Sequence, residues 1–589
     1  MHVFEVWAPF AHSVNVRIGN SSYPLQSSQH GWWKAKVRDA QPGIDYSFTI
    51  DGGDPLPDPR SQYQPNGVTG PSRLIDHSSF NWTDGNWQQT SLSRAVIYEL
   101  HVGTFTLEGT FLSAMSRLDY LVNLGVTHIE LMPVNEFSGL WGWGYDGVYL
   151  YAPHHAYGTP DDLKSLVNAC HAKGLAVLLD VVYNHFGPVG NYLGRYGPYV
   201  TGAHRTPWGA AVNLDHRGSD EVRRFLSENA LMWLRDYHFD GLRLDAIHAF
   251  FDFSAVHFLE FLALEVDALS AQLGRRLLLI SESDLNDPRG VTSREKGGYG
   301  IDAQWSDDFH HALHTVLTGE SDGYYEDFGS LAQLAKAFQR VFVYDGIYSS
   351  HRDRLHGRPV IGLSAHHFIV FAQNHDQIGN RAQGERLSQL VSIGRQKIAA
   401  ALVLTSPFVP MLFQGEEFGA SSPFCYFSQH DDPEIGKQVS EGRKAEFQAF
   451  GWDSKQIPDP QDPQTFRQSK LRWEEIDREP HKSLLNWYKH LIALRRSLPE
   501  LADGRLDQIE VNFDDCAKWF VVKRGTIEVA CNLASHRQAV PIRAKSKSIL
   551  SSEEGYRLCS EAIELPPDSV AVLSAVPLAS KERYLAQGA

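Results

Sequence analysis

Carboxylates stand at the ends of four apolar runs in the middle of the chain. Asp180 ends LAVLLD, Asp245 ends GLRLD, Glu282 follows LLLIS and Asp376 follows FIVFAQNH. Arg243 and Asp245 are two residues apart, so in a strand both side chains point to the same face. The guanidinium would keep Asp245 ionised, which suits a nucleophile. Glu282 lies between two serines, and we expect a drier, less charged setting there that keeps it protonated as a general acid.

Only a fold that brings several strand ends to one face could place these carboxylates together. From Ala95 onward, apolar runs of strand length alternate with amphipathic stretches such as DDLKSLVNACHAKG. Near-continuous hydrophobic strands separated by helices indicate a parallel sheet covered on both faces. We count eight such strands, which predicts a (β/α)8 TIM barrel of the α/β class, with its active site at the carboxyl ends of the strands. An open doubly wound sheet is the alternative.

Two β-rich segments flank the predicted barrel. Val14, Val16 and Ile18 alternate with polar residues near the N-terminus, and short strands such as WFVVKR and SVAVLSA recur near the C-terminus. The segment NWTDGNWQQTSLSR between the first β region and the barrel is typical of a linker. The predicted domains are an N-terminal β-sandwich at 1–86, a catalytic barrel at 87–497 with loop insertions at 186–220 and 308–365, and a C-terminal β domain at 498–589.

Composition limits the classes of protein that the chain can belong to. There are 54 Lys and Arg against 70 Asp and Glu, and the net charge of −16 argues against a nucleic-acid partner. The five cysteines are dispersed without CxxC spacing, so we expect reduced thiols. The segment MHVFEVWAPF lacks the features of a signal peptide, and no run approaches the ~18 apolar residues of a membrane span. We therefore expect a cytoplasmic protein with no membrane partner.

A metal site is an alternative interpretation of the same residues. His185, Asp245, Glu282 and His375 could imitate the ligand set of a barrel metallohydrolase. The first strand, however, has no HxH pair, and the 186–220 segment lacks the Asp-rich cage that would join Asn184 around calcium. We predict no required metal and no organic cofactor.

Four motifs together resemble the signature regions of the α-amylase family of glycoside hydrolases. They are DVVYNH, GLRLDAIHA, the glutamate of ISESD, and FAQNHD, in the order and on the strands that the family uses. The resemblance implies a retaining reaction in which Asp245 is the nucleophile and Glu282 the acid/base. Asp376 would be the third carboxylate, which orients the sugar and stabilises the transition state.

Finer segments resemble those members of the family that release trehalose. These segments are GGYGIDAQWSDDFHHALH, GEEFGASSPF and GRKAEFQAFGW, while VWAPFAHSVNVRI is similar to the N-terminal module of branching and debranching members as well. The resemblance implies cleavage of the α-1,4 bond next to the terminal trehalose unit of maltooligosyl trehalose. It also implies a maltooligosyltrehalose synthase as pathway partner, and we expect a monomer or dimer. A glucan branching enzyme and a non-catalytic glycan-binding protein are the alternatives.

Substrate-binding residues follow from the same motifs. The resemblance implies that three residues flank the cleaved bond, namely Arg243, His185 and His375. Tyr145 would stack on a sugar ring, and Asp180 would be the supporting carboxylate of the first motif. Asp307, Asp308 and His310 start the connection after the sixth strand, where they would bind the leaving disaccharide or simply be solvated. The full set is Tyr145, Asp180, His185, Arg243, His248, Asp307, Asp308, His310, His375, Gln377, Asn380 and Arg381.

Overall fold

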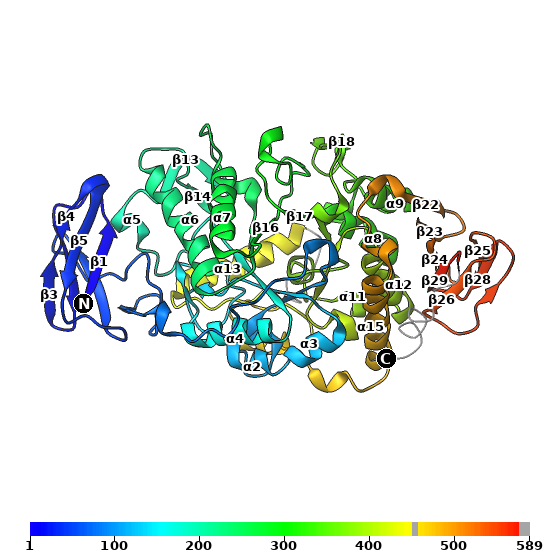
Figure 1. Ribbon diagram of the computed structural model, residues 1–589, viewed down its shortest axis with the longest axis horizontal. Coiled ribbons are helices and arrows are strands. Elements are labelled where there is room, and N and C mark those ends of the chain that lie inside the picture. The colour runs from blue at the N-terminus through cyan, green and yellow to red at the C-terminus, as the bar shows by residue number, and fades with distance from the viewer. Residues whose placement is uncertain (450–456, 577–589) are drawn as a thin grey trace.

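The computed structural model of the protein describes residues 1–449 and 457–576. Three regions lie in a row along the longest axis, with the N-terminal strands in blue at one end and the C-terminal strands in orange to red at the other (Figure 1). The last 13 residues assigned to the C-terminal domain, 577–589, and the end of the GRKAEFQAFGW segment, 450–452, lie outside the described residues. The central region holds the barrel.

Eight parallel strands close a barrel in the order β8, β9, β12, β15, β16, β17, β20, β21. All eight runs counted in the sequence form its strands, which confirms the predicted TIM barrel and excludes the open sheet. Their bounds are β8 Ile97–Leu100, β9 His128–Leu131, β12 Ala176–Val181, β15 Gly241–Leu244, β16 Leu278–Ser281, β17 Ala303–Trp305, β20 Phe368–Val370 and β21 Val409–Phe413.

Alternation along these strands separates the inside of the barrel from the helix layer. On β15, Leu242 and Leu244 belong to the large core under the helices, as the two-residue spacing from Arg243 predicts. The lower part of the barrel interior is apolar and is filled by Ile97, Leu178, Ile280, Ile369 and Met411, among others. Two residues further along several strands the inward positions become charged. The strand ends therefore carry a polar layer on an apolar floor.

Helices alternate with the barrel strands and cover them. Helix α4 shows why one begins where it does: Thr159 caps it, Pro160 occupies its first turn, and Asp162 returns the capping bond to the Thr159 main chain. The helices are α1 Val102–Phe105, α2 Phe111–Met115, α3 Leu118–Leu124, α4 Pro160–Ala172, α5 Leu193–Tyr196, α6 Ser219–Asp236, α7 Phe258–Leu273, α8 Asp307–Thr318, α9 Leu331–Arg340, α10 His375–Gly379, α11 Leu387–Leu390, α12 Ile393–Leu404, α13 Pro433–Ala449, α14 Pro463–Gln468 and α15 His481–Ser497.

The two long connections contain regular structure. Residues 186–220 hold α5 and the hairpin of β13 (Val200–Thr206) and β14 (Gly209–Val212). Residues 308–365 hold nearly all of α8, then α9 and the hairpin of β18 (Asp345–Ser349) and β19 (Arg354–Gly357). A third hairpin, β10 (Asn135–Glu136) with β11 (Tyr149–Pro153), encloses the WGWGYDG loop. All three hairpins follow carboxyl ends of barrel strands.

Two small sheets form the N-terminal region. Their strands are β1 His2–Trp7, β5 Trp32–Val37 and β4 Gln26–Ser27 in one sheet, and β3 Ser21–Pro24, β2 Val14–Ile18, β6 Asp45–Ile50 and β7 Ser72–Arg73 in the other. The segment predicted as a linker is packed on the barrel: Trp87 Nε1 donates to Asp240 Oδ1 (2.7 Å), and Trp82 stacks on His238 with ring centres 3.7 Å apart. Its aromatic residues explain why a polar, turn-rich sequence is fixed in place.

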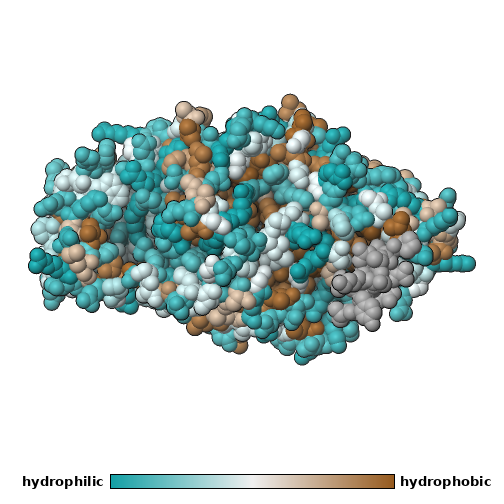
Figure 2. Space-filling view, viewed as in Figure 1, coloured by the Kyte–Doolittle hydropathy of each residue, from teal (hydrophilic) through white to brown (hydrophobic). Residues whose placement is uncertain are grey.

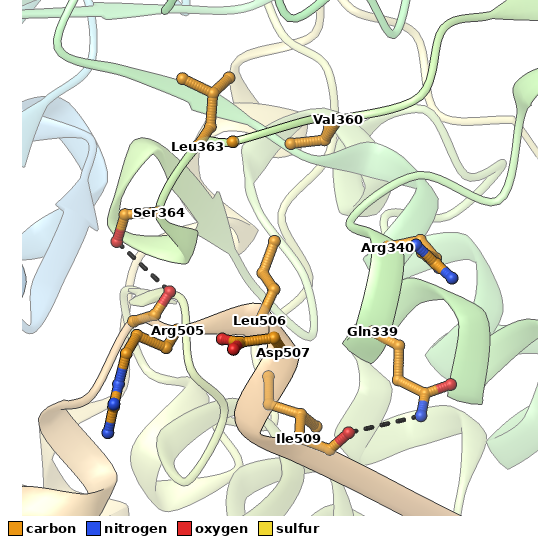
Figure 3. A pocket seen from close by; sticks show the side chains of 11 residues that line it. Gln339, Arg340, Val360, Leu363, Ser364, Arg505, Leu506, Asp507 and Ile509 are labelled. Carbon is orange, nitrogen blue, oxygen red and sulfur yellow. Dashed lines mark hydrogen bonds between the residues drawn. The ribbon is translucent and has the colours of Figure 1, made fainter.

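The C-terminal region again consists of two sheets, in agreement with the predicted β domain. Their strands are β22 Ile509–Asp514, β23 Trp519–Arg524, β24 Ile527–Asn532, β29 Ser569–Ser574 and β26 Lys547–Ser551, then β25 Gln538–Pro541, β28 Ala562–Leu565 and β27 Arg557–Leu558. A cavity of about 710 Å³ lies where this region meets α9 (Figure 3). Ser364 bonds to the Gly504 carbonyl and Gln339 to the Ile509 carbonyl at its wall. None of the predicted catalytic carboxylates lines it.

The surface carries hydrophobic side chains in scattered groups among hydrophilic ones on the face shown in Figure 2. Within the described residues, none of the helices combines the length and apolar character needed to span a bilayer.

Candidate active site

A second cavity, of about 780 Å³, opens at the carboxyl ends of the barrel strands. We call it the carboxylate cavity. Among the predicted residues, it is lined by Tyr145, His185, Arg243, Asp245, His248, Glu282, His375, Asp376 and Asn380. The remaining lining residues are Trp143, Asp146, Pro207, Trp208, Ala246, Tyr426, Val439, Gly442 and Arg443. Side chains from β15 and from the residues that follow β15, β16 and β20 thus converge on one space, as expected for the strand ends of a barrel.

Arg243 lies at the centre of the cavity floor and contacts three carboxylates. Its Nη1 lies 2.8 and 2.7 Å from the two oxygens of Asp180 and 2.8 Å from Asp245 Oδ1. Its Nη2 lies 2.9 Å from Glu282 Oε2. Only 1% of the Arg243 side chain is exposed, and the guanidinium also lies 4.3 Å from the centre of the Trp305 ring. Because the cation is desolvated, each of these contacts is stronger than a surface ion pair.

Both oxygens of Asp245 are held in place. Arg243 binds Oδ1, while Asn184 Nδ2 donates to Oδ2 (2.6 Å) and to the Asp245 carbonyl (2.9 Å). Two donors, one on each oxygen, fix the direction of this carboxylate. Asn184, considered in the sequence only as a calcium ligand, is therefore placed to orient Asp245.

Glu282 has a more charged environment than the flanking serines suggest. Its Oε2 accepts the main-chain N–H of Ala246 (2.8 Å) and lies beside Arg243. The expectation of a less charged setting is wrong, because Arg243 spans from β15 to the end of the neighbouring strand β16, with which it is in register. Ala246, between the two carboxylates, has φ 42° and ψ 54°. A left-handed alanine is strained, and such strain is found at functional sites.

Asp376 is on the first turn of α10 and faces the other two carboxylates. Asn380 Nδ2 donates to its Oδ1 (2.7 Å), and Arg443 Nη1 in turn donates to Asn380 (2.9 Å). Burial raises the pKa of Asp376, and the positive charge of His375 opposes that rise. The pKa of Asp307, which lies close by, is also raised, by burial and by Glu282 and Asp376. The cavity thus contains more carboxyl groups than cations to balance them.

Tyr145 and His375 form the wall next to Asp180. The Tyr145 hydroxyl donates to Asp180 Oδ2 (2.6 Å) and lies 2.8 Å from His375 Nε2. The two rings are stacked at 5.2 Å. Burial raises the pKa of Tyr145 well above its ordinary value, so the phenol stays protonated. Burial likewise raises the pKa of Asp180 to about 7, and Arg243 opposes that rise.

Several predicted substrate-binding residues lie outside the carboxylate cavity. Asp308 is buried at the start of α8 and accepts bonds from Asn286 and from the main-chain N–H groups of Val343 and Tyr344. His310 bonds to the Ala372 carbonyl and the Tyr325 hydroxyl. Both side chains therefore fasten the 308–365 segment to the barrel, because helix α8 begins where the sequence suggested an open loop. Asp180 also lies outside the cavity lining and accepts a hydrogen bond from Arg243. Gln377 donates to Asp307 (3.3 Å), and Arg381 forms an ion pair with Glu320 (2.8 Å).

Sequence reasoning missed the residues that long-range folding brings to the cavity rim. Trp208, at the tip of the β13–β14 hairpin, is 50% exposed and stacks on His185 with ring centres 4.7 Å apart. Arg443 and Gly442 come from α13, and Tyr426 from the segment before it. The GRKAEFQAFGW segment was the signal that could have identified Arg443. Nothing in the sequence near Trp208 marks that residue.

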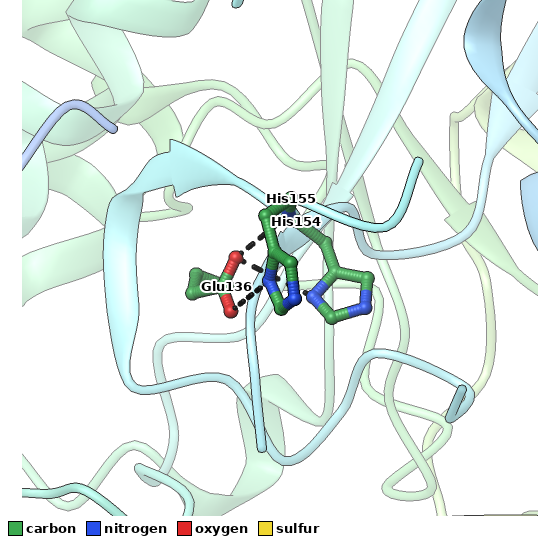
Figure 4. Close-up of side chains that lie close together, drawn as sticks. All are labelled: Glu136, His154 and His155. Carbon is green, nitrogen blue, oxygen red and sulfur yellow. Dashed lines mark hydrogen bonds and ion pairs between the residues drawn. The ribbon is translucent and has the colours of Figure 1, made fainter. Parts of the chain in front are cut away.

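Two groups within the described residues bring a carboxylate and two imidazoles close enough to hold a metal ion. In one, the Glu136 carboxylate faces the rings of His154 and His155, which lie together on one side of it, at the root of the β10–β11 hairpin (Figure 4). Glu136 Oε1 lies 2.8 Å from His155 Nδ1, and Oε2 lies 3.4 Å from His154 Nδ1. The other group is His204, Asp215 and His216 beside the β13–β14 hairpin. Neither lies in the carboxylate cavity, so neither can act on a bond cleaved there.

Comparison with known proteins agrees with this geometry. The family model described as "Alpha amylase, catalytic domain" matches residues 75–196, and a domain of unknown function matches residues 504–572. A malto-oligosyltrehalose trehalohydrolase from Rhizobium sp. (strain M-11) is 49% identical over 580 residues, covering 97% of each chain. One from Arthrobacter ramosus is 51% identical over 543 residues, covering 91% of this chain and 94% of its own.

Solved structures agree as well. The crystal structure of a Salmonella typhimurium protein assigned to the alpha amylases superposes with a TM-score of 0.89 at 37% identity, covering 97% of both chains. The similarity extends through the barrel and both flanking β regions. This chain therefore belongs to the malto-oligosyltrehalose trehalohydrolases, within the α-amylase family of glycoside hydrolases.

Proposed function

We propose that this protein hydrolyses the α-1,4-glucosidic bond next to the terminal trehalose unit of maltooligosyl trehalose, releasing trehalose and a shortened maltooligosaccharide. The proposal rests on one observation above all: Asp245, Glu282 and Asp376 share one cavity at the strand ends, with Arg243 between the first two. Family membership supplies the substrate class.

In the first step Asp245 attacks the anomeric carbon while Glu282 protonates the departing glycosidic oxygen, which forms a β-glycosyl-enzyme. The bond from the sugar carbon to the leaving oxygen breaks as the bond to Asp245 forms. Arg243 and Asn184 hold the Asp245 carboxylate in a fixed position, so the attacking oxygen needs no reorientation.

In the second step the ionised Glu282 takes a proton from water, and the resulting hydroxide releases the sugar from Asp245. Two displacements at one carbon retain the α configuration. Asp376, oriented by Asn380, would accept hydrogen bonds from the sugar hydroxyls. These bonds should strengthen as the ring flattens, which is binding energy realised in the transition state.

The rim residues supply surfaces for the sugars on either side of the cleaved bond. Trp208 presents a half-exposed indole face at the rim, and aromatic faces of this kind stack on the apolar faces of sugar rings. Arg443 and His248 add donors at the rim. We assign recognition of the trehalose unit to this rim rather than to Asp308 and His310, whose hydrogen bonds are made within the protein.

A glucan branching enzyme remains the second candidate, because the same carboxylates can pass the glycosyl group to a sugar instead of water. Product analysis separates the two activities. Purified protein is incubated with maltotetraosyl trehalose, maltohexaose and amylose. Rapid release of trehalose with little attack on the plain chains is expected, whereas altered branching of amylose without trehalose would contradict the proposal.

Variants test the assigned roles in the same assay. Asp245→Asn should abolish turnover while substrate still binds, because an amide cannot form the glycosyl ester. Glu282→Gln should slow cleavage by about 10²-fold or more, the usual contribution of a general acid. Normal rates in either variant would refute the corresponding role.

The proposed setting is the cytoplasm, where a maltooligosyltrehalose synthase would supply the substrate. Five free cysteines, three of them buried, suit a reducing compartment. The proposed state is a monomer or dimer.

A further inference from the structure

Glu99, which the reaction scheme leaves without a role, lies next to the carboxylate cavity inside the barrel. It is on β8 and 1% exposed, and its carboxylate contacts His375, which follows β20, the next strand but one around the barrel. Its Oε2 accepts the main-chain N–H of His375 (3.1 Å), and its Oε1 contacts His375 Nδ1. Both carboxylate oxygens are therefore directed at one residue, and that residue lines the cavity.

The hydrogen bonds around His375 determine how many protons its ring carries. A carboxylate can only accept, so His375 Nδ1 must donate to Glu99. On the other side of the ring, the Tyr145 hydroxyl gives its hydrogen to Asp180 Oδ2 and has only a lone pair to offer to Nε2. His375 Nε2 must then donate as well. A ring that donates from both nitrogens is an imidazolium.

The opposite proton arrangement would need a protonated Asp180. In that case Asp180 would donate to Tyr145, Tyr145 would donate to His375, and the imidazole would be neutral. Burial raises the pKa of Asp180 to about 7, but Arg243 Nη1 lies 2.8 and 2.7 Å from its two oxygens and the Tyr145 hydroxyl donates to Oδ2, and these donors favour the carboxylate. The first arrangement therefore fits the contacts better.

We propose that Glu99 is a positioning residue of this site, which holds His375 as an imidazolium against Tyr145 and next to Asp376. The inference rests on the proposed function, in which Asp376 binds sugar hydroxyls as a carboxylate. Burial raises the pKa of Asp376, and the His375 charge is the main effect that opposes it. Glu99 thus acts on Asp376 through His375.

The groups that surround His375 come from several elements. Burial works against its charged form, but the Glu99 carboxylate outweighs burial, and the pKa of His375 is raised. Asp376 acts in the same direction, and Arg243 acts against it. The remaining neighbours are Tyr145, the rings of Trp143 and Trp305, and His101, whose own pKa is lowered by burial.

The variant Glu99→Gln should fold while removing the charge. The introduced amide oxygen can accept the His375 main-chain N–H, and its NH₂ group can donate to Nδ1 of a neutral imidazole. His375 Nε2 would keep its bond to Tyr145. The hydrogen bonds are thus conserved, and only the proton on His375 is lost.

The barrel offers a matched control. Glu130 on β9 lies opposite Glu99 in register, is equally buried, and neither of its carboxyl oxygens has a hydrogen-bond partner among the described residues. Burial, with Glu99 and Asp180 nearby, raises its pKa well above the ordinary range, so it is a neutral acid at the assay pH. Glu130→Gln replaces one neutral group with another of the same shape and should leave the activity profile unchanged.

The first experiment compares kcat and kcat/KM against pH for the wild type, Glu99→Gln and Glu130→Gln. Without the His375 charge the pKa of Asp376 rises, so its ionised fraction falls about tenfold per unit below that pKa. We expect the acidic limb of Glu99→Gln to move to higher pH, with kcat reduced most at the acidic end of the profile and least at pH 8. An unmoved limb in Glu99→Gln, or an equal movement in Glu130→Gln, would overturn the proposal.

A second measurement does not depend on turnover. In wild-type protein labelled with ¹⁵N-histidine, the His375 signals are identified by their loss in His375→Gln. Two similar ring-nitrogen frequencies at neutral pH are expected for the imidazolium, and two widely separated frequencies would refute it. If the protein instead proved to be a transferase, this measurement would still decide the state of His375.

Discussion

Arg243 should determine both the stability and the activity of the carboxylate cavity, and replacing it tests the reasoning on the site directly. The residue is 1% exposed and contacts Asp180, Asp245 and Glu282. In Arg243→Gln these carboxylates lose their shared cation. Removing one partner of a buried ion pair costs about 3–5 kcal/mol because the other charge stays buried.

The expected change in melting temperature follows from the size of the chain. Unfolding entropy is about 2.1 cal/mol/K per residue, which for 589 residues gives roughly 1.2 kcal/mol/K. A loss of about 3–5 kcal/mol therefore lowers the melting temperature by about 2.5–4 °C if the chain unfolds as one unit. Arg243→Lys keeps a charge but cannot reach Asp180, Asp245 and Glu282 at once, so we expect a smaller loss and equally poor catalysis.

The direction in which the stability of Arg243→Gln changes with pH gives a stricter test of the role of Arg243. Burial already raises the pKa of Asp180 to about 7 while Arg243 opposes the rise. Without the guanidinium this pKa moves further up, so the folded variant binds more protons than the unfolded chain and its stability falls as pH rises. The deficit against wild type should be small near pH 5 and largest near pH 8, measured by calorimetry. Equal melting temperatures at pH 8, or a deficit that grows on acidification, would refute this role of Arg243.

Two further predictions concern the rim and the base of the loops. Trp208→Ala should raise KM about 5- to 30-fold with a smaller effect on kcat, because a stacking surface worth about 1–2 kcal/mol is lost. Steady-state kinetics measure this change, and an unchanged KM would exclude sugar stacking on Trp208. Glu136→Gln should lower the melting temperature most between about pH 4.5 and 6.5. The pKa of Glu136 is lowered despite burial and that of His155 is raised by their hydrogen bond, so the pair gives its full stabilisation between the two unfolded-state pKa values and loses it as either partner is discharged outside them. A deficit independent of pH would contradict the ion pair.

The barrel and its carboxylates were predictable because they depend on local patterns. Each strand is a short apolar run, and each functional side chain stands at a fixed offset from the end of such a run. Alternation on β15 places Arg243 and Asp245 inward whatever the rest of the chain does. The family motifs indicated which of these residues would be the nucleophile, the acid/base and the third carboxylate.

Residues whose placement depends on distant segments were not predictable in this way. Trp208 reaches the cavity only because the β13–β14 hairpin folds back over His185. The charged environment of Glu282 depends on the length of the Arg243 side chain and on the register of β15 with β16. The serines on either side of Glu282 reveal neither. Asp308 and His310 looked like loop residues because helix α8 starts without a strong capping signal, and Ser306 makes no side-chain cap bond.

The charge balance of the cavity indicates that its carboxyl groups titrate as a group. Asp180, Asp245 and Glu282 surround Arg243, while Asp376 and Asp307 lie near the same space. Burying several negative charges around few cations favours retention of a proton among them, and the titration belongs to the group rather than to one residue. We therefore expect substitutions that remove a negative charge from this group to shift the pH dependence of activity, even where the substituted residue never touches the sugar.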